Sequence, residues 1–205
     1  MSKDLYEYEY VGGRPSLDFV NTVGGLRPAS ASEHLVAYGD LIRWARQARL
    51  IDSRRGQALL AEAARHPQRA EQAVESARRV REALHDLILS ALRSRRPPAQ
   101  ALELVNRWIA DAMSRRRLIP RGSGYELDWQ EEPGDLLAFL IPLALDAAEI
   151  LSGELERVHI CDEAEVGRCG WLFLDETKNH TRRYCTMKEC GNRAKQRRFR
   201  RRLSS

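Results

Sequence analysis

Hydrophobic and polar positions between residues 35 and 116 recur with the spacing of helices. Apolar side chains fall three or four residues apart, which places them along one face of a helix. This pattern predicts helices over about 35–48, 53–66, 68–94 and 99–116. The longest of them carries an apolar stripe at Ala70, Ala73, Val74, Ala77, Val80, Leu84, Leu87, Ile88 and Leu92. We interpret the stripe as domain core, although its near-heptad spacing also fits a dimer seam.

Alternating patterns flank these helices. From Leu5 to Val11, tyrosines alternate with glutamates, which predicts a strand with one packed face. Residues 118–120, a turn at Arg121–Gly124 and the alternating residues 125–129 predict a hairpin.

Two further signals predict where helices begin or bend. Ser30 and Glu33 have the spacing of a capping box at the start of a helix. A last helix is expected over about 135–151, with a kink at Pro142, because proline removes a backbone hydrogen bond.

All four cysteines lie in one stretch, at Cys161, Cys169, Cys185 and Cys190. Seven residues separate the first pair, four separate the second, and fifteen lie between the pairs. Two close pairs joined by a spacer are typical of a structural zinc site with four thiolate ligands. Disulfides would need an oxidising compartment, and the charged first ten residues do not resemble a signal peptide. His159 and His180 compete as ligands, but we favour a strand residue and a turn residue.

The spacer and the residues after it predict how the cysteines are presented. The alternation over 171–175, a turn near His180 and a return over 181–184 predict a hairpin. Thr186 and Glu189 then fit a capping box, which puts Cys190 in the first turn of a helix. Knuckle, hairpin and helix form a treble-clef-like finger that holds one structural zinc per chain.

The blocks CGWLFLD, RRYC and CGNRAK, from Cys169 through Lys195, resemble the CGNR zinc finger family of bacterial proteins. The block from Ser16 to Thr22 resembles the opening of the ABATE domain that accompanies this finger. This chain departs from the family at the first cysteine pair, where the family usually has a shorter loop. The resemblance implies a zinc-binding, DNA-binding module attached to an N-terminal ABATE domain, in stress-induced regulators of transcription.

Positive charge gathers at the C-terminal end. The net charge of +5 is the balance of +9 over residues 182–205 and −4 over residues 1–181. Such concentration is the footprint of a polyanion binder, with a frayed basic tail as the alternative. Asn192 and Arg193 also have the chemistry to hold the finger's own loops. The residues expected to contact nucleic acid are Asn192, Arg193, Lys195, Gln196, Arg197, Arg198, Arg200, Arg201 and Arg202.

Asp18, Asn21 and Thr22 are polar positions among apolar neighbours. They predict either the floor of a ligand pocket or a hydrogen-bonded core network. The sequence holds no phosphate-binding glycine loop, nucleophile elbow or HExxH pair, so we expect no enzyme. No apolar run approaches the roughly 20 residues of a membrane span, so we expect no membrane association and a cytoplasmic protein.

The sequence thus predicts an α+β, mainly α protein with 43% hydrophobic residues and two domains. Residues 1–153 form an ABATE-like helical domain with a small β component, which senses an unknown small-molecule ligand or mediates homodimerisation. Residues 154–205 form the zinc finger with its basic helix. We expect a zinc-dependent, DNA-binding transcriptional regulator. The alternatives are an RNA-binding or protein-interaction module, or a redox sensor that releases zinc.

Overall fold

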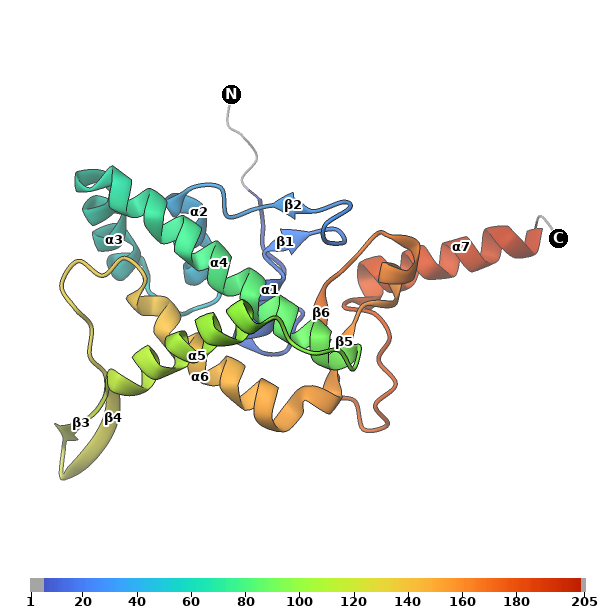
Figure 1. The fold of residues 1–205 in the computed structure, drawn as a ribbon. Coiled ribbons are helices and arrows are strands. Elements are labelled where there is room, and N and C mark those ends of the chain that lie inside the picture. Colours follow the sequence, from blue (N-terminus) through green and yellow to red (C-terminus); the bar gives the residue numbers. More distant parts are fainter. Residues whose placement is uncertain (1–5, 204–205) are drawn as a thin grey trace. The chain divides into compact units, whose positions relative to one another are not determined.

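The computed structural model describes residues 6–203 and divides the chain into two compact units. One unit joins residues 6–34 to residues 154–203, and the other is Leu35–Gly153. The cysteine-rich end therefore shares a unit with N-terminal residues (Figure 1). The division into folding domains at residue 153 remains a prediction.

The unit Leu35–Gly153 is built from helices that bury their apolar faces. Helices α2 (Tyr38–Gln47), α3 (Ser53–Arg65), α4 (Pro67–Leu92) and α5 (Ala99–Ser114) lie where the periodicity predicts them. Helix α5 packs against both α4 and α6 (Ile141–Glu149). The stripe on α4 is buried at Ala70, Ala73, Val74, Ala77, Leu84, Leu87 and Ile88, which confirms that it is core.

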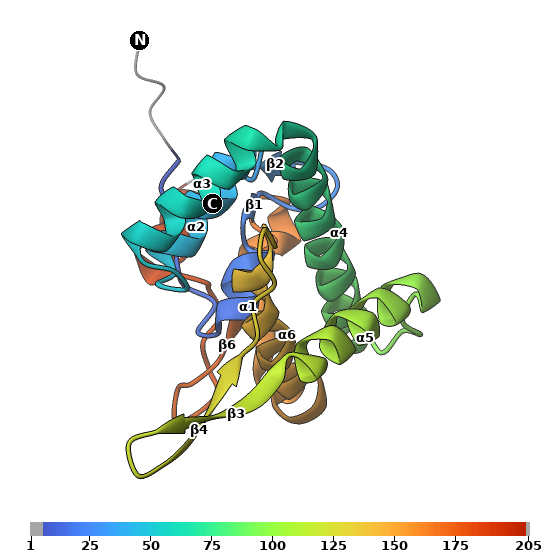
Figure 2. The ribbon, with the colours of Figure 1, turned by 90° about the vertical axis from the view of Figure 1, so that its left-hand side faces the viewer.

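The predicted hairpin follows α5. Strands β3 (Arg116–Arg121) and β4 (Gly124–Trp129) pair antiparallel, from Arg116 opposite Trp129 to Arg121 opposite Gly124. At its base the Arg116 guanidinium lies 4.4 Å from the centroid of the Trp129 ring. In Figures 1 and 2 the hairpin projects from the end of α5, away from the other helices of this unit.

The single kinked helix expected over 135–151 is wrong. A 3-10 turn, η1 (Ala138–Leu140), precedes α6, and a π turn, η2 (Ile150–Glu154), follows it. Pro142 lies in the first turn of α6. An N–H at that position has no carbonyl partner within the helix, so proline starts the helix there instead of kinking it.

The capping box expected at Ser30 and Glu33 is also wrong. Ser32–Glu33 form the short strand β2, which pairs antiparallel with β1 (Val23–Gly24). The Ser30 hydroxyl accepts the Leu26 N–H at 2.9 Å within the intervening loop. The helix begins later, where the Asp40 carboxylate accepts two backbone N–H groups just before α2, at 3.0 and 2.8 Å.

The strand expected over Leu5–Val11 is wrong for residues 6–11, which join no ladder in the described part of the chain. Leu5 lies outside the described residues. The alternation has another cause. Tyr8 is buried and donates its hydroxyl to the His34 carbonyl at 2.8 Å, while the Tyr6 ring stacks on the His34 ring with centroids 3.5 Å apart.

The unit of residues 6–34 and 154–203 contains α1 (Pro15–Val20), η3 (Leu155–Arg157), β5 (Val158–Ile160), β6 (Leu172–Leu174) and α7 (Asn192–Leu203). Its hairpin differs from the expected one, because β6 pairs with β5, Val158 opposite Leu174, and not with residues 181–184. In Figure 1, α7 projects beyond β5 and β6. Among residues 6–203, no helix has both the length and the apolar character needed to span a lipid bilayer.

Candidate metal centre and basic helix

The four cysteines converge from two short loops. Cys161 follows β5 and Cys169 precedes β6, so the β5–β6 hairpin holds both ends of the first loop. Cys185 and Cys190 belong to the second loop, in which the π turn η5 (Met187–Gly191) carries Cys190. The four sulfur atoms lie within 4.8 Å of one another, and all four side chains are buried.

The sulfur cluster fits one tetrahedral zinc ion. The Sγ–Sγ distance is 3.8 Å between Cys169 and Cys185 and 3.6 Å between Cys185 and Cys190. Thiolates about 2.3 Å from a common zinc would lie about 3.8 Å apart. A disulfide would need about 2.05 Å, and all four cysteines are free. Four buried protein ligands leave no open position, so the zinc is structural.

Neither candidate histidine belongs to the cluster. The metal-ligating group found among residues 6–203 consists of the four cysteines. His159 lies on β5 with its ring centroid 5.9 Å from that of Phe173. His180 has a φ of 48° between β6 and the second cysteine loop. The interpretation of these residues as a strand residue and a turn residue is confirmed.

Hydrogen bonds among the thiols separate their pKa values. Bonds with Cys169, then Cys185 and Cys190, lower the pKa of Cys161. The bond with Cys161 is the main cause that raises the pKa of Cys169 and of Cys185. The set ionises fully only when a divalent ion supplies compensating positive charge. Metal binding is therefore coupled to proton release and to folding of the two loops.

N-terminal residues complete the second edge of β6. The Asn21 amide brackets Leu172, accepting its N–H at 2.9 Å and donating to its carbonyl at 2.8 Å. The Leu174 N–H donates to the Gly12 carbonyl at 2.8 Å. Asn21 thus takes the place of a neighbouring strand, although it lies 151 positions from Leu172.

Close approach of the same N-terminal segment explains the glycine after Cys169. The Gly170 N–H donates to the Gly25 carbonyl at 2.9 Å. A Cβ at position 170 would lie 3.0 Å from that same oxygen, tighter than ordinary contact. The next residue, Trp171, donates its indole N–H to the Val23 carbonyl at 2.8 Å. The CGW block is therefore shaped by backbone groups of residues 23–25.

The three candidate pocket residues make the hydrogen bonds that a core network predicts. Asp18 accepts the Gly12 N–H at 2.8 Å, and the Thr22 hydroxyl donates to the Phe19 carbonyl at 2.7 Å. Asn21 is buried and bonded to β6, as described above. A role for these three residues in ligand binding stays a prediction.

The carboxylate of Asp175 holds the spacer between the cysteine pairs. It accepts the amide and the hydroxyl of Thr177 at 2.8 and 2.6 Å and the amide of Arg182 at 2.8 Å. Burial raises the pKa of this carboxyl, but the hydrogen bonds outweigh burial and lower the pKa to about 2. These bonds draw residues 177–182 into a loop, which explains why no second strand forms there.

Arg182 is a structural residue that the sequence motifs did not reveal. Its guanidinium lies 4.3 Å from the centroid of the Phe173 ring. It also donates to the backbone carbonyls of Val11, Leu174, Tyr184 and Cys185. Because its partners are mostly backbone groups, no side-chain pattern could have indicated this role.

The second loop leads directly into α7. The Thr186 side chain accepts the Lys188 N–H at 3.2 Å, which confirms the expected cap. Glu189 does not complete a capping box, since its carboxylate accepts from Arg193 at 2.6 Å. Asn192 donates to the Lys188 carbonyl at 3.0 Å. Asn192 and Arg193 thus make contacts within the finger itself.

A buried acid in the first loop holds the middle of α7. Glu163 lies on the 3-10 turn η4 (Asp162–Val166) and is fully buried. Its two oxygens accept from the Arg197 guanidinium at 2.6 and 3.0 Å, and these bonds raise the pKa of Arg197. The partners are 34 positions apart, so cysteine spacing gave no sign of the pair.

Apart from Ala194 and Arg197, all residues of α7 are exposed. Ala194 is buried and Arg197 is half-buried, which defines the inner side of the helix. At about 100° per residue, the opposite side carries Lys195, Gln196, Phe199, Arg202 and Leu203. Phe199 and Leu203 are 63% and 72% exposed. Of the nine residues expected to contact nucleic acid, all are exposed except Arg197.

Two family models match the chain. The ABATE model, described as "Putative stress-induced transcription regulator", matches residues 13–154. The chain belongs to the ABATE family. The CGNR zinc finger model matches residues 157–203 of this ABATE protein, so the resemblance carried by the motifs is confirmed. No curated protein matches the chain.

The two matches assign a regulatory class to this ABATE protein. Neither family is an enzyme family. The CGNR match contains all four cysteines, so Cys161 lies inside the finger despite the longer first loop. The ABATE match covers residues of both compact units, because residues 13–34 pack with the finger.

Proposed function

We propose that this ABATE protein regulates transcription in the cytoplasm by binding DNA through α7. The observation that carries the proposal is an exposed basic helix that begins two residues after the buried Cys190. Family membership supports a regulatory role. The charge of +9 over residues 182–205 supports a polyanionic partner.

The outward side of α7 has a composition suited to a DNA groove. The Gln196 amide can bond base edges, and Phe199 and Leu203 offer apolar contact to thymine methyl groups. Basic residues flank this strip on both sides and would meet phosphates, namely Lys195, Arg198 and Arg202 on one flank and Arg200 on the other. Because the major groove of B-DNA admits an α-helix, we infer that α7 docks there.

Zinc would be held by Cys161, Cys169, Cys185 and Cys190, and would link the two loops that support α7. In zinc-finger peptides the metal contributes on the order of 10 kcal/mol to folding. The Glu163–Arg197 pair then fixes the direction of the helix. The unit Leu35–Gly153 would supply the regulatory signal, as a ligand sensor or as a dimerisation unit.

The test is a salt series of DNA affinity measured by fluorescence anisotropy. If six to ten phosphates are contacted, affinity falls by about three to five decades between about 50 and 200 mM salt. Competition with structured RNA and with an acidic polymer separates DNA binding from RNA binding and from protein interaction. A salt-independent affinity, or tighter binding to either competitor, contradicts the proposal.

A further inference from the structure

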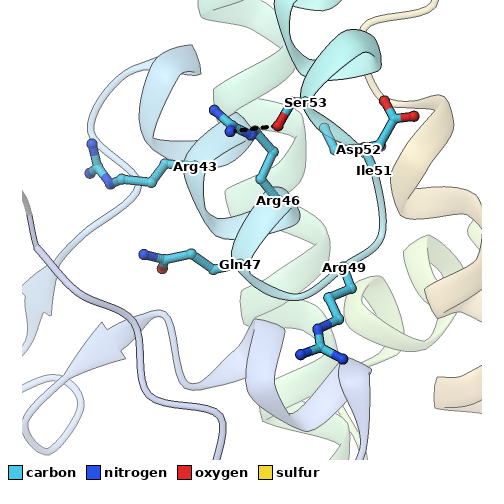
Figure 3. Close-up of a pocket in the computed structure, with 7 residues that line it drawn as sticks. All are labelled: Arg43, Arg46, Gln47, Arg49, Ile51, Asp52 and Ser53. Atoms are coloured by element: carbon cyan, nitrogen blue, oxygen red, sulfur yellow. Dashed lines mark hydrogen bonds between the residues drawn. The ribbon is translucent and has the colours of Figure 1, made fainter.

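The helical unit contains a hollow bordered by arginines. It lies at the turn between α2 and α3 and has a volume of about 600 Å³. Its lining consists of Arg43, Arg46, Gln47, Arg49, Ile51, Asp52 and Ser53 (Figure 3). We infer that this hollow binds a polyphosphate chain, the group carried by nucleoside di- and triphosphates and by inorganic polyphosphate. The inference goes beyond the proposed DNA binding and involves no residue of α7.

Positive charge predominates around the hollow. Its carboxylate, Asp52, already accepts the Arg55 N–H at 2.7 Å as the cap of α3. Arg43 shares its charge with Asp40, at 2.6 Å. Arg46 bonds the neutral Ser53 hydroxyl at 2.9 Å. Within residues 6–203 no carboxylate pairs with Arg46 or Arg49, so an anionic ligand would compensate both charges.

The spacing of the arginines favours a chain of linked anionic groups. Arg43 and Arg46 lie three residues apart on α2, a rise of about 4.5 Å, and Arg49 follows just beyond the end of the helix. In Figure 3 they leave α2 and the turn in different directions, with Arg46 reaching Ser53. A single phosphate would meet one of them, whereas a di- or triphosphate can meet several. Guanidinium groups bind phosphate oxygens through paired, charge-assisted hydrogen bonds.

Two energetically unfavourable backbone features, a positive φ at Arg49 and a glycine within α3, place Arg49 and Arg46 beside the hollow. Arg49 has a φ of 59°, in the left-handed region that usually takes glycine after a helix end. Gly56 lies within α3, where glycine weakens a helix. A Cβ at position 56 would lie 2.9 Å from Cδ of Arg46, so glycine leaves room for the Arg46 stem. Ligand binding by Arg46 and Arg49 would account for both unfavourable features.

The melting temperature of Arg49→Gly distinguishes a structural role for Arg49 from a role in ligand binding. Cations near the C-terminus of a helix stabilise it through the helix dipole, and in that case Arg49→Gly would lower the melting temperature. If Arg49 serves a ligand, Arg49→Gly relieves the strained φ and keeps or raises the melting temperature, while ligand binding is lost.

The test is calorimetric titration of the full, zinc-loaded chain with inorganic triphosphate in 150 mM salt, with zinc content checked afterwards. We expect one saturable site, because salt at this concentration screens the exposed charges of α7. Arg49→Gly and Arg46→Gln each weaken it by at least about tenfold, because charge-assisted hydrogen bonds are removed. Arg79→Gln removes the same charge from α4, outside the hollow, and leaves the affinity unchanged.

A second titration with ATP identifies the source of the chain. Binding of ATP with the same variant dependence indicates a nucleotide, and binding of inorganic triphosphate alone indicates inorganic polyphosphate. Absence of binding by the wild type overturns the inference, as does an equal loss in Arg79→Gln. If Arg49→Gly fails to fold, Arg46→Gln decides. The same variants should bind DNA with the affinity of the wild type. The phosphate site and DNA binding by α7 can therefore be refuted independently of each other.

Discussion

Single side chains in the finger act mostly on backbone groups. Asn21 brackets one residue of β6, Asp175 gathers two amides and a hydroxyl, and Arg182 donates to backbone carbonyls. Each side chain forms hydrogen bonds with backbone groups that have no strand partner. The backbone N–H and carbonyl groups around two strands of only three residues are therefore hydrogen-bonded.

Asp175 makes the stability of the finger depend on pH. Its pKa of about 2 lies below the value of about 3.9 for an unfolded aspartate. The unfolded state therefore takes up the proton first, and the stabilisation is complete above about pH 4 and is lost as pH falls through about 2.

Carbon NMR of the Asp175 carboxyl tests this: in the pH range in which the four thiolates still hold zinc, the carboxyl should stay ionised and show no titration midpoint at about 3.9. Asp175→Asn should be less stable than the wild type at neutral pH, because asparagine has one acceptor oxygen where both oxygens of Asp175 accept hydrogen bonds. A midpoint near that of an unfolded aspartate, in protein that still holds its zinc, would show that the hydrogen bonds do not hold the carboxylate.

At the residue scale, the sequence predicted the ligands but not their supports. The cysteines are recognisable because zinc requires a small set of residue types at short spacings. Asn21, Glu163 and Arg182 are ordinary polar residues whose partners lie far along the chain or in the main chain. Their roles became visible only with the fold.

At the scale of elements, the first cysteine loop and α7 work as a pair. The loop folds into η4, whose buried Glu163 holds Arg197 in the middle of α7. We predict that Glu163→Gln weakens DNA binding by roughly tenfold, because a helix without this anchor makes fewer phosphate contacts. Simple electrostatics predicts the reverse, since the substitution removes a negative charge from a polyanion binder.

Fluorescence anisotropy with Glu163→Gln and Glu165→Gln distinguishes the two effects. Glu165 is an exposed acid in the same loop, so its removal should raise affinity slightly or leave it unchanged. Equal increases in both variants would refute the positioning role of Glu163. Zinc content, measured in both, confirms that the metal centre is intact.

Elements set by the residues within them were predicted well, whereas elements that depend on residues far along the chain were not. The long helices follow from periodicity, and Asp52 caps α3 as its position indicates. The sequence predicted the wrong partner for β6. This strand pairs with β5, on the other side of the first cysteine loop, and not with residues 181–184. The helix near Pro142 was misread because proline fits a first turn as well as a kink.

At the scale of the whole molecule, residues 6–34 pack in the same compact unit as the finger. Most of them nevertheless belong to the ABATE match and not to the CGNR match. The CGNR match begins at residue 157 and leaves out Asn21, Gly12 and Gly25, which bond β6 and the residue after Cys169. We expect the finger to lose stability when this N-terminal edge is disturbed.

Asn21→Ala tests that expectation. It leaves the buried N–H and carbonyl of Leu172 unpaired, which costs about 3 kcal/mol. Hydrogen exchange of the amides of residues 174 and 175 should accelerate by about 100-fold, and chelator should remove zinc faster. Asn106→Ala, at an exposed position of α5, is the control. Unchanged exchange in Asn21→Ala would show that the finger stands without this edge.

The most direct test of the metal centre is X-ray absorption at the zinc edge, on protein purified without added zinc. One zinc per chain with four sulfur neighbours at about 2.3 Å is expected. A shell that contains nitrogen or oxygen at about 2.0–2.1 Å, or protein without zinc, would contradict a finger whose basic helix is aimed by four thiolates.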